Sequence, residues 1–142
     1  MIHVAQMTVR TPAAIRWFRT FWQGDAWARD EGFLVKSVLT ETFGSEGAPR
    51  PWRVQANLGD GRLLVVGYSR LEAADLAERA ALALPGLRAA LDAAEIVTAP
   101  FDAPGEGRAV QGWVTLCPTR RTGMAEGGGA AERRRELDAY LH

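Results

Sequence analysis

Two strand-like segments joined by a very short turn constrain the fold of this chain more than any other feature. The segments PWRVQANL and RLLVVGYS, residues 51–58 and 62–69, are separated only by Gly-Asp-Gly at 59–61. A glycine- and aspartate-containing connection of this length favours a tight turn between two paired strands. The sequence therefore predicts an antiparallel β-hairpin over these residues.

The residues before the hairpin predict a strand followed by a broken helix. Residues 2–9 alternate apolar side chains with small or polar ones, which is typical of a strand. Thr11 is suited to cap a helix, and Pro12 is suited to its first position. A break near Gly24 interrupts this helix. The acids at 30–31 favour the start of its second part, because negative charge stabilises a helix N-terminus.

The residues after the hairpin predict a helical region and one more strand. Residues 71–84 are rich in alanine and leucine and favour a helix, and residues 87–94 add another helical turn or two. A short extended piece at 95–101 leads into residues 108–122, whose long alternating pattern predicts the last strand. The charged residues 132–142 predict a short helix.

The resulting order is strand, helix, strand, strand, helix, strand, which is the split βαβ arrangement. We therefore expect an α+β, ferredoxin-like (RRM-like) βαββαβ domain over residues 1–122, with a broken first helix. Residues 123–142 are expected to form a flexible linker and a short helix, as a C-terminal helical appendage. Because many unrelated functions use this fold, the fold alone does not indicate a chemistry.

Composition limits the classes of function. The 142 residues are 47% hydrophobic and 24% charged, as in an ordinary globular domain. The chain lacks both an apolar run near the roughly 18 residues of a membrane span and the pattern of a signal peptide, so we expect a cytoplasmic protein without a membrane partner. Cys117 is the single cysteine, and the two histidines lie at opposite ends, so we expect no disulfide, metal or other cofactor.

The helical segment at 33–43 carries Lys36, the only lysine of the chain. At about 100° per residue, one side of this helix is expected to pack on the sheet. That side contains Val35, Val38, Leu39 and Thr42, flanked by Leu34 and Phe43. The other side carries Phe33, Lys36, Ser37 and Thr40. Two explanations stay open: a scattered exposed ring with a solvated lysine, or a small site in which the ring and the ammonium meet single-stranded RNA.

Several segments, taken in order, resemble the N-terminal part of the CasE family, the repeat-RNA endoribonucleases of type I-E CRISPR systems. They begin with the M-x-VR strand at 7–10 and DEGFLVKSVLTETFG at 30–44, which is followed by APRPWRV. After these come LLVVGYSR, the alanine-rich helix, VTAPF, VQGWVTLCPTRRT and the charged ERRRELDAYL. The resemblance covers most of the chain.

The resemblance implies metal-independent cleavage of CRISPR repeat RNA to a 2′,3′-cyclic phosphate, with Lys36 and Phe33 at the catalytic positions. The family typically has a histidine and a tyrosine there. Phenylalanine has no hydroxyl, and lysine is suited to donate a proton or to act as a fixed cation. Members of the family usually continue into a second ferredoxin-like domain, so residues 123–142 correspond to the connection that leads to a domain absent here.

The resemblance also suggests which residues contact RNA. Arg120 and Arg121 end the expected last strand and match arginine-rich positions of the family, although a solvated strand end explains them as well. Arg10, Ser37 and Arg70 complete the expected RNA contacts. The implied partners are CRISPR repeat RNA and other subunits of a type I-E effector complex.

Two further functions fit the same residues. The departures at positions 33 and 36, with the missing second half, favour a non-catalytic RNA-binding subunit of a CRISPR effector complex. The net charge of zero favours a protein-interaction module on a ferredoxin-like fold without any role in RNA binding. Cleavage of the repeat RNA is the function that the resemblance favours.

Overall fold

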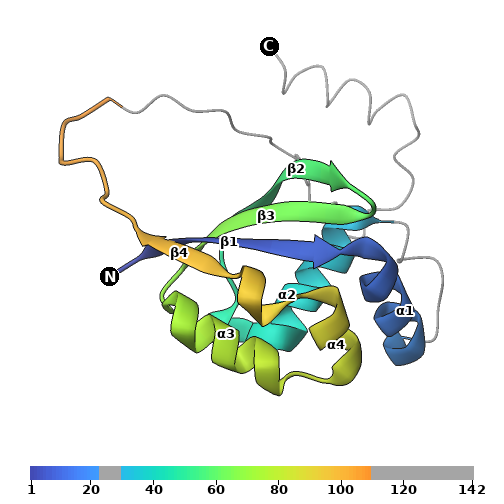
Figure 1. Cartoon of the computed structure of the whole chain (residues 1–142). Coiled ribbons are helices and arrows are strands. Elements are labelled where there is room, and N and C mark those ends of the chain that lie inside the picture. The colour runs from blue at the N-terminus through green and yellow to red at the C-terminus, as the bar shows by residue number, and fades with distance from the viewer. Residues whose placement is uncertain (23–29, 110–142) are drawn as a thin grey trace, which may run out of the picture. The chain divides into compact units, whose positions relative to one another are not determined.

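The computed structural model describes residues 1–22 and 30–109 of the chain. Its elements belong to a compact unit over Met1–Pro104. They are β1 (His3–Arg10), α1 (Thr11–Trp22), α2 (Glu31–Gly47), β2 (Trp52–Gly59), β3 (Arg62–Ser69), α3 (Ala73–Leu82), α4 (Pro85–Ala90), the 3₁₀ helix η1 (Ala93–Glu95) and β4 (Val97–Pro100). Helices and an antiparallel sheet share this unit, so the predicted α+β class is confirmed (Figure 1).

The sheet has four strands in the order β2-β3-β1-β4, and every neighbouring pair is antiparallel. Because β1 and β2 are both antiparallel to β3, they run in the same direction with β3 between them. The helices α1 to α4 lie on one face of this sheet (Figure 1). The strand order is compatible with a ferredoxin-like fold.

The predicted hairpin is confirmed, and it also holds the start of α1. Asp60 and Gly61 take positive φ angles of 53° and 72°, as a two-residue hairpin turn requires, and Gly59 pairs with Arg62. The backbone N–H of Thr11 donates a hydrogen bond of 2.7 Å to the carbonyl oxygen of Gly61. The turn therefore anchors the junction between β1 and α1.

Alternate residues of the two central strands supply the sheet side of the core. Ala5, Met7 and Val9 of β1 and Leu63 and Val65 of β3 are almost fully buried. On the helix side they meet a cluster that includes Trp17, Phe18, Leu34, Leu39, Phe43, Leu76, Leu87 and Leu91. Burial of each large apolar side chain contributes roughly 1.5–3 kcal/mol.

Contacts at both ends hold α2 in place. At its start, the Asp30 carboxylate accepts a hydrogen bond of 3.0 Å from the backbone N–H of Phe33, so the predicted acidic start is confirmed. At its far end, Gly44 takes a φ of 78°, and Nη1 of Arg79 in α3 donates a 2.6 Å hydrogen bond to the carbonyl oxygen of Phe43. A cation at this end also complements the helix dipole.

One side of α2 is as predicted and the other is not. Its predicted core side is buried, but the prediction that Phe33 and Ser37 point away from the core is wrong. Phe33 is half-buried, with its ring edge-to-face against Phe18 of α1 at a centroid distance of 5.8 Å. Ser37 is 9% exposed. A second helix, α1, lies beside α2 and covers this flank.

The fourth strand of the described sheet comes from a different segment than predicted. β4 pairs with β1 from Gln6 opposite Val97 to His3 opposite Pro100. The prediction of a short extended piece at 95–101 is confirmed, but its pairing in the sheet was not predicted. Most of the predicted strand at 108–122, the break near Gly24, the predicted boundary at residue 122 and the predicted linker and helix at 123–142 lie outside the described residues.

The connection between α2 and β2 packs directly on β3. The peptide bond between Arg50 and Pro51 is cis. The N–H of Arg50 donates a 2.7 Å hydrogen bond to the Tyr68 carbonyl oxygen, and the N–H of Tyr68 donates one of 3.1 Å to the Pro51 carbonyl oxygen. A Cβ on Gly67 would lie 2.9 Å from the Cβ atoms of both Pro49 and Trp52. Gly67 therefore permits this close approach.

We expect Gly67→Ala to lower the free energy of unfolding by about 1–3 kcal/mol, because the added methyl group overpacks the contact with Pro49 and Trp52. Denaturant unfolding of the variant measures this loss. Gly105→Ala is the matched control, since a Cβ at Gly105 meets nothing within 4 Å. Equal stability of the two variants would contradict the packing described here.

Candidate functional site

An open groove of about 470 Å³ lies between α2 and the connection that leads to β2. Its lining residues are Lys36, Leu39, Thr40, Ala48, Pro49, Arg50, Pro51 and Trp52. These residues provide two cations, a hydroxyl and an indole ring, and none of them carries a carboxylate. The volume is within the range of ordinary ligand sites, about 300–1,000 Å³.

The helical spacing of α2 places Lys36 and Thr40 together at the groove. They are four residues apart and therefore lie one turn apart on the same side of the helix. Val35, Val38 and Leu39 are buried beside them, which leaves the Lys36 side chain exposed at the edge of the buried stripe. The burial of α2 in the core thus determines the position of the ammonium.

The backbone around Arg50 is held on the opposite side of the groove. Its two hydrogen bonds with Tyr68 attach it to β3. Pro49 and Pro51 flank it, and each proline ring restricts its own φ angle. The Arg50 side chain is exposed at this wall, while Trp52 is half-buried and packs against the core. The groove therefore has one wall from a helix and one from a segment bound to the sheet.

The charges of this groove suit an anion. Among the described residues, neither Lys36 nor Arg50 forms an ion pair with a carboxylate. The ion pairs found in this part of the chain are those of Arg10. A guanidinium binds phosphate in a bidentate manner, and a lysine ammonium adds a point charge. Thr40 supplies a hydroxyl at the same place. The arrangement is suited to a phosphate group, with an aromatic ring close by.

The structure separates the two residues that were expected to share a catalytic site. Lys36 lines the groove, whereas Phe33 does not and instead packs against Phe18. Ser37, an expected RNA contact, uses its hydroxyl to donate a 2.8 Å hydrogen bond to the Phe33 carbonyl oxygen. Trp52, and not Phe33, is the aromatic residue in the lining of the groove.

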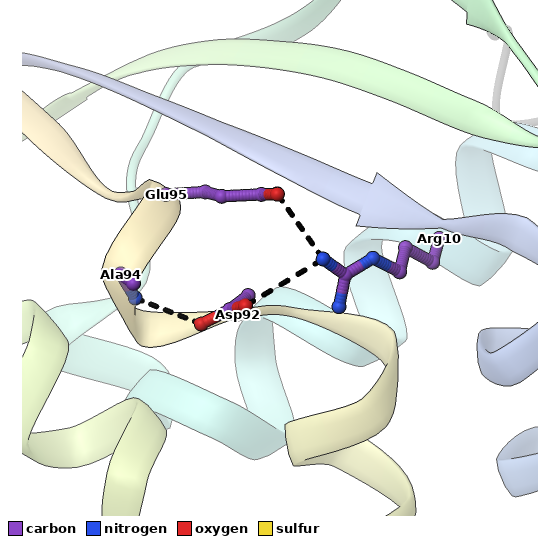
Figure 2. A network of polar contacts seen from close by, with 4 residues as sticks. All are labelled: Arg10, Asp92, Ala94 and Glu95. Atoms are coloured by element: carbon purple, nitrogen blue, oxygen red, sulfur yellow. Dashed lines mark hydrogen bonds and ion pairs between the residues drawn. The ribbon is translucent and has the colours of Figure 1, made fainter.

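Arg10, another expected RNA contact, belongs to a network of polar contacts at the end of β1 (Figure 2). Its Nη2 atom lies 3.1 Å from Oε1 of Glu95 and 3.5 Å from Oδ2 of Asp92. The Asp92 carboxylate also accepts a 2.9 Å hydrogen bond from the N–H of Ala94. The two carboxylates thus offset the positive charge of the Arg10 guanidinium. These contacts also connect the end of β1 to η1.

The remaining expected contacts do not line the groove. Arg70 is exposed just after β3 and is not among the lining residues. Arg120 and Arg121 lie outside the described residues. Arg50 and Trp52 line the groove but were not predicted as site residues. The sequence signal for them is the arginine between two prolines, followed by tryptophan, in APRPWRV.

Comparisons with protein-family models, with curated proteins and with solved structures found no match. Within residues 1–22 and 30–109, none of the helices has the length and apolar character needed to cross a membrane. In the same ranges, His, Cys, Asp and Glu side chains form no group of three that could hold a metal ion.

We expect Arg10→Gln to lower the free energy of unfolding by up to about 1 kcal/mol, the usual limit for partly exposed ion pairs. The side chains of Arg10 and Glu95 are each 35% exposed, so high salt reduces the loss. A double-mutant cycle with Glu95→Gln measures the coupling. Additive effects of the two substitutions would contradict a stabilising pair.

Proposed function

We propose that this chain is a CRISPR RNA-processing protein of the CasE type, which binds the repeat stem-loop of the precursor transcript in the cytoplasm and cleaves it without a metal. The single observation that carries the proposal is the groove shared by Lys36 and Arg50, whose lining residues contain no carboxylate. The ordered sequence resemblance to the family supplies the identity of the RNA. Other subunits of a type I-E effector complex are the proposed protein partners.

The proposal includes a ferredoxin-like fold for residues 1–104. The strand order β2-β3-β1-β4, with β1 and β2 in the same direction and helices on one face, supports it. In a split βαβ unit, two strands of the same direction are joined through helices and a third strand lies between them. β1, the helices α1 and α2, and β2 have this relationship, with β3 as the inserted strand.

In the proposed reaction, a ribose 2′-oxygen attacks the adjacent phosphorus and the bond from phosphorus to the 5′-oxygen breaks. A 2′,3′-cyclic phosphate forms, the 2′-hydroxyl proton passes to solvent, and the leaving 5′-oxygen takes a proton. Lys36 donates that proton or stabilises the negative charge of the phosphorane, and Arg50 holds the non-bridging oxygens. Phe33 acts indirectly, because its contact with Phe18 supports the helix that carries Lys36.

A second candidate is a non-catalytic subunit that binds the repeat RNA and does not cut it. One observation favours it specifically. None of the residues that line the groove is a histidine, aspartate or glutamate, so the groove offers no usual general base for the 2′-hydroxyl. Binding of the repeat RNA by the same two cations is common to both candidates.

We expect Lys36→Ala to slow cleavage of labelled repeat RNA by about 10²-fold or more, since a placed proton donor or charge-stabilising group contributes at least this much. The assay measures product formation in excess chelator. Arg88→Ala is the matched control, because Arg88 is exposed on α4 and is not among the groove residues.

Equal cutting by the wild type and Lys36→Ala would remove Lys36 from the mechanism. Tight binding by the wild type without any product would instead support the non-catalytic subunit. Absence of both binding and cutting would refute both candidates.

We expect Arg50→Ala to reduce the slope of log affinity against log salt concentration by about 0.7–0.9, which corresponds to the loss of one phosphate contact. Titration of the repeat RNA at several salt concentrations measures this slope. The control is Arg16→Ala, which removes an exposed cation of α1. An equal change of this slope in both variants would mean that Arg50 contributes only to the overall charge of the protein and makes no specific phosphate contact.

A further inference from the structure

We propose that the face of the sheet turned away from the helices binds an unpaired RNA segment that leads out of the groove, with Tyr68 and Phe101 contacting its bases. The path of this segment rests on the proposed function, which places the repeat RNA in the groove. The proposal adds a second contact region and a class of ligand, single-stranded RNA, that the groove alone does not specify.

The register of the strands defines this surface, here called the outer face. Because Ala5, Met7, Leu63 and Val65 point toward the helices, the residues between them point the other way. The outer face comprises Val4, Gln6 and Thr8 of β1, Leu64, Val66 and Tyr68 of β3, Arg53 of β2, and Val97 and Ala99 of β4. Thr8 is buried, so the exposed part of this face lies toward Val4 and Tyr68. Among the elements that the structure describes, no helix covers it (Figure 1).

An aromatic pair stands at one end of the outer face. The rings of Tyr68 and Phe101 meet edge-to-face, with their centroids 5.0 Å apart and their planes at 72°. The backbone N–H of Phe101 donates a 2.9 Å hydrogen bond to the carbonyl oxygen of Ile2, which holds Phe101 beside β1. Tyr68 stays 38% exposed. The pair therefore presents ring surface that is fixed in position and accessible to a ligand.

The charge of the sheet complements a phosphate backbone. The four strands contain no aspartate or glutamate. Arg53 lies opposite Val66 on the outer face, is exposed, and has no carboxylate partner among the described residues. Asp102 follows Phe101 directly, so phosphates are favoured on the Arg53 side of the rings. Aromatic rings and a cation on one surface are the usual features of a site that binds single strands.

The outer face adjoins the groove through one residue. Tyr68 forms both backbone hydrogen bonds that hold the Arg50–Pro51 wall of the groove. An RNA strand that leaves the groove over this wall therefore meets the Tyr68 ring next. A paired stem buries its bases in the duplex, so only an unpaired flank has bases free to stack there. For this reason we assign the outer face to a single-stranded flank of the repeat stem-loop.

The experiment compares two RNAs, a repeat stem-loop with its unpaired flanks and the same stem-loop trimmed of both flanks. We expect the wild type to bind the flanked RNA more tightly. We expect Tyr68→Leu to weaken binding of the flanked RNA by about 5- to 150-fold, the effect of losing one stacked base, with no change for the trimmed RNA. Tyr68→Phe keeps the ring and is expected to keep the affinity. Thermal unfolding of Tyr68→Leu and Tyr68→Phe controls for loss of fold.

A second probe, oligouridylate, tests the outer face without the repeat sequence. We expect Arg53→Ala and Tyr68→Leu to weaken its binding, and Arg88→Ala, on α4, to leave it unchanged. If neither the flanked RNA nor oligouridylate shows a contribution that depends on Tyr68, the inference is overturned, even if Lys36-dependent cutting is intact. If oligouridylate binding depends on Tyr68 while repeat RNA is neither cut nor preferred, binding of single-stranded RNA by the outer face is supported and the proposed function is refuted.

Discussion

The antiparallel pairing of β1 with β3 is the interaction on which the rest of the structure depends. The strands pair over their full length, from His3 opposite Ser69 to Arg10 opposite Arg62. This register turns Ala5 and its alternate neighbours toward the helices and the intervening residues toward the outer face. A slip of one residue would exchange the two sets, so the core and both candidate surfaces require this one register.

The groove adds a second requirement. The segment that connects α2 to β2 must approach β3 at Gly67 more closely than a side chain at that position would allow. Gly67 meets this requirement because it has no Cβ, and the backbone of the next residue, Tyr68, then pairs with Arg50 and Pro51. Lys36 reaches the same groove from a helix that is held by its buried side. Two independently supported walls thus place both cations, Lys36 and Arg50, in the lining of one groove.

Arginines of this chain differ in their environment, although they are identical in the sequence. Arg10 is neutralised by Asp92 and Glu95, and Arg79 donates a hydrogen bond to the end of α2. Arg50 and Arg53 are exposed and have no carboxylate partner among the described residues. Glu95, one of the two partners of Arg10, lies 85 residues away in the chain, so no local pattern separates the structural arginines from those available to a ligand.

The sequence by itself determined the features that depend on a few neighbouring residues. The hairpin at 59–61, the capping of α2 by Asp30 and the buried stripe of α2 follow from turn chemistry, capping and helical periodicity, which act over one or two turns of chain. Only the tertiary structure decided that Phe33 packs on Phe18, that residues 97–100 form a strand paired with β1, and that Arg50 lines the same groove as Lys36. These outcomes depend on contacts between segments far apart in the chain, which periodicity and propensity do not encode.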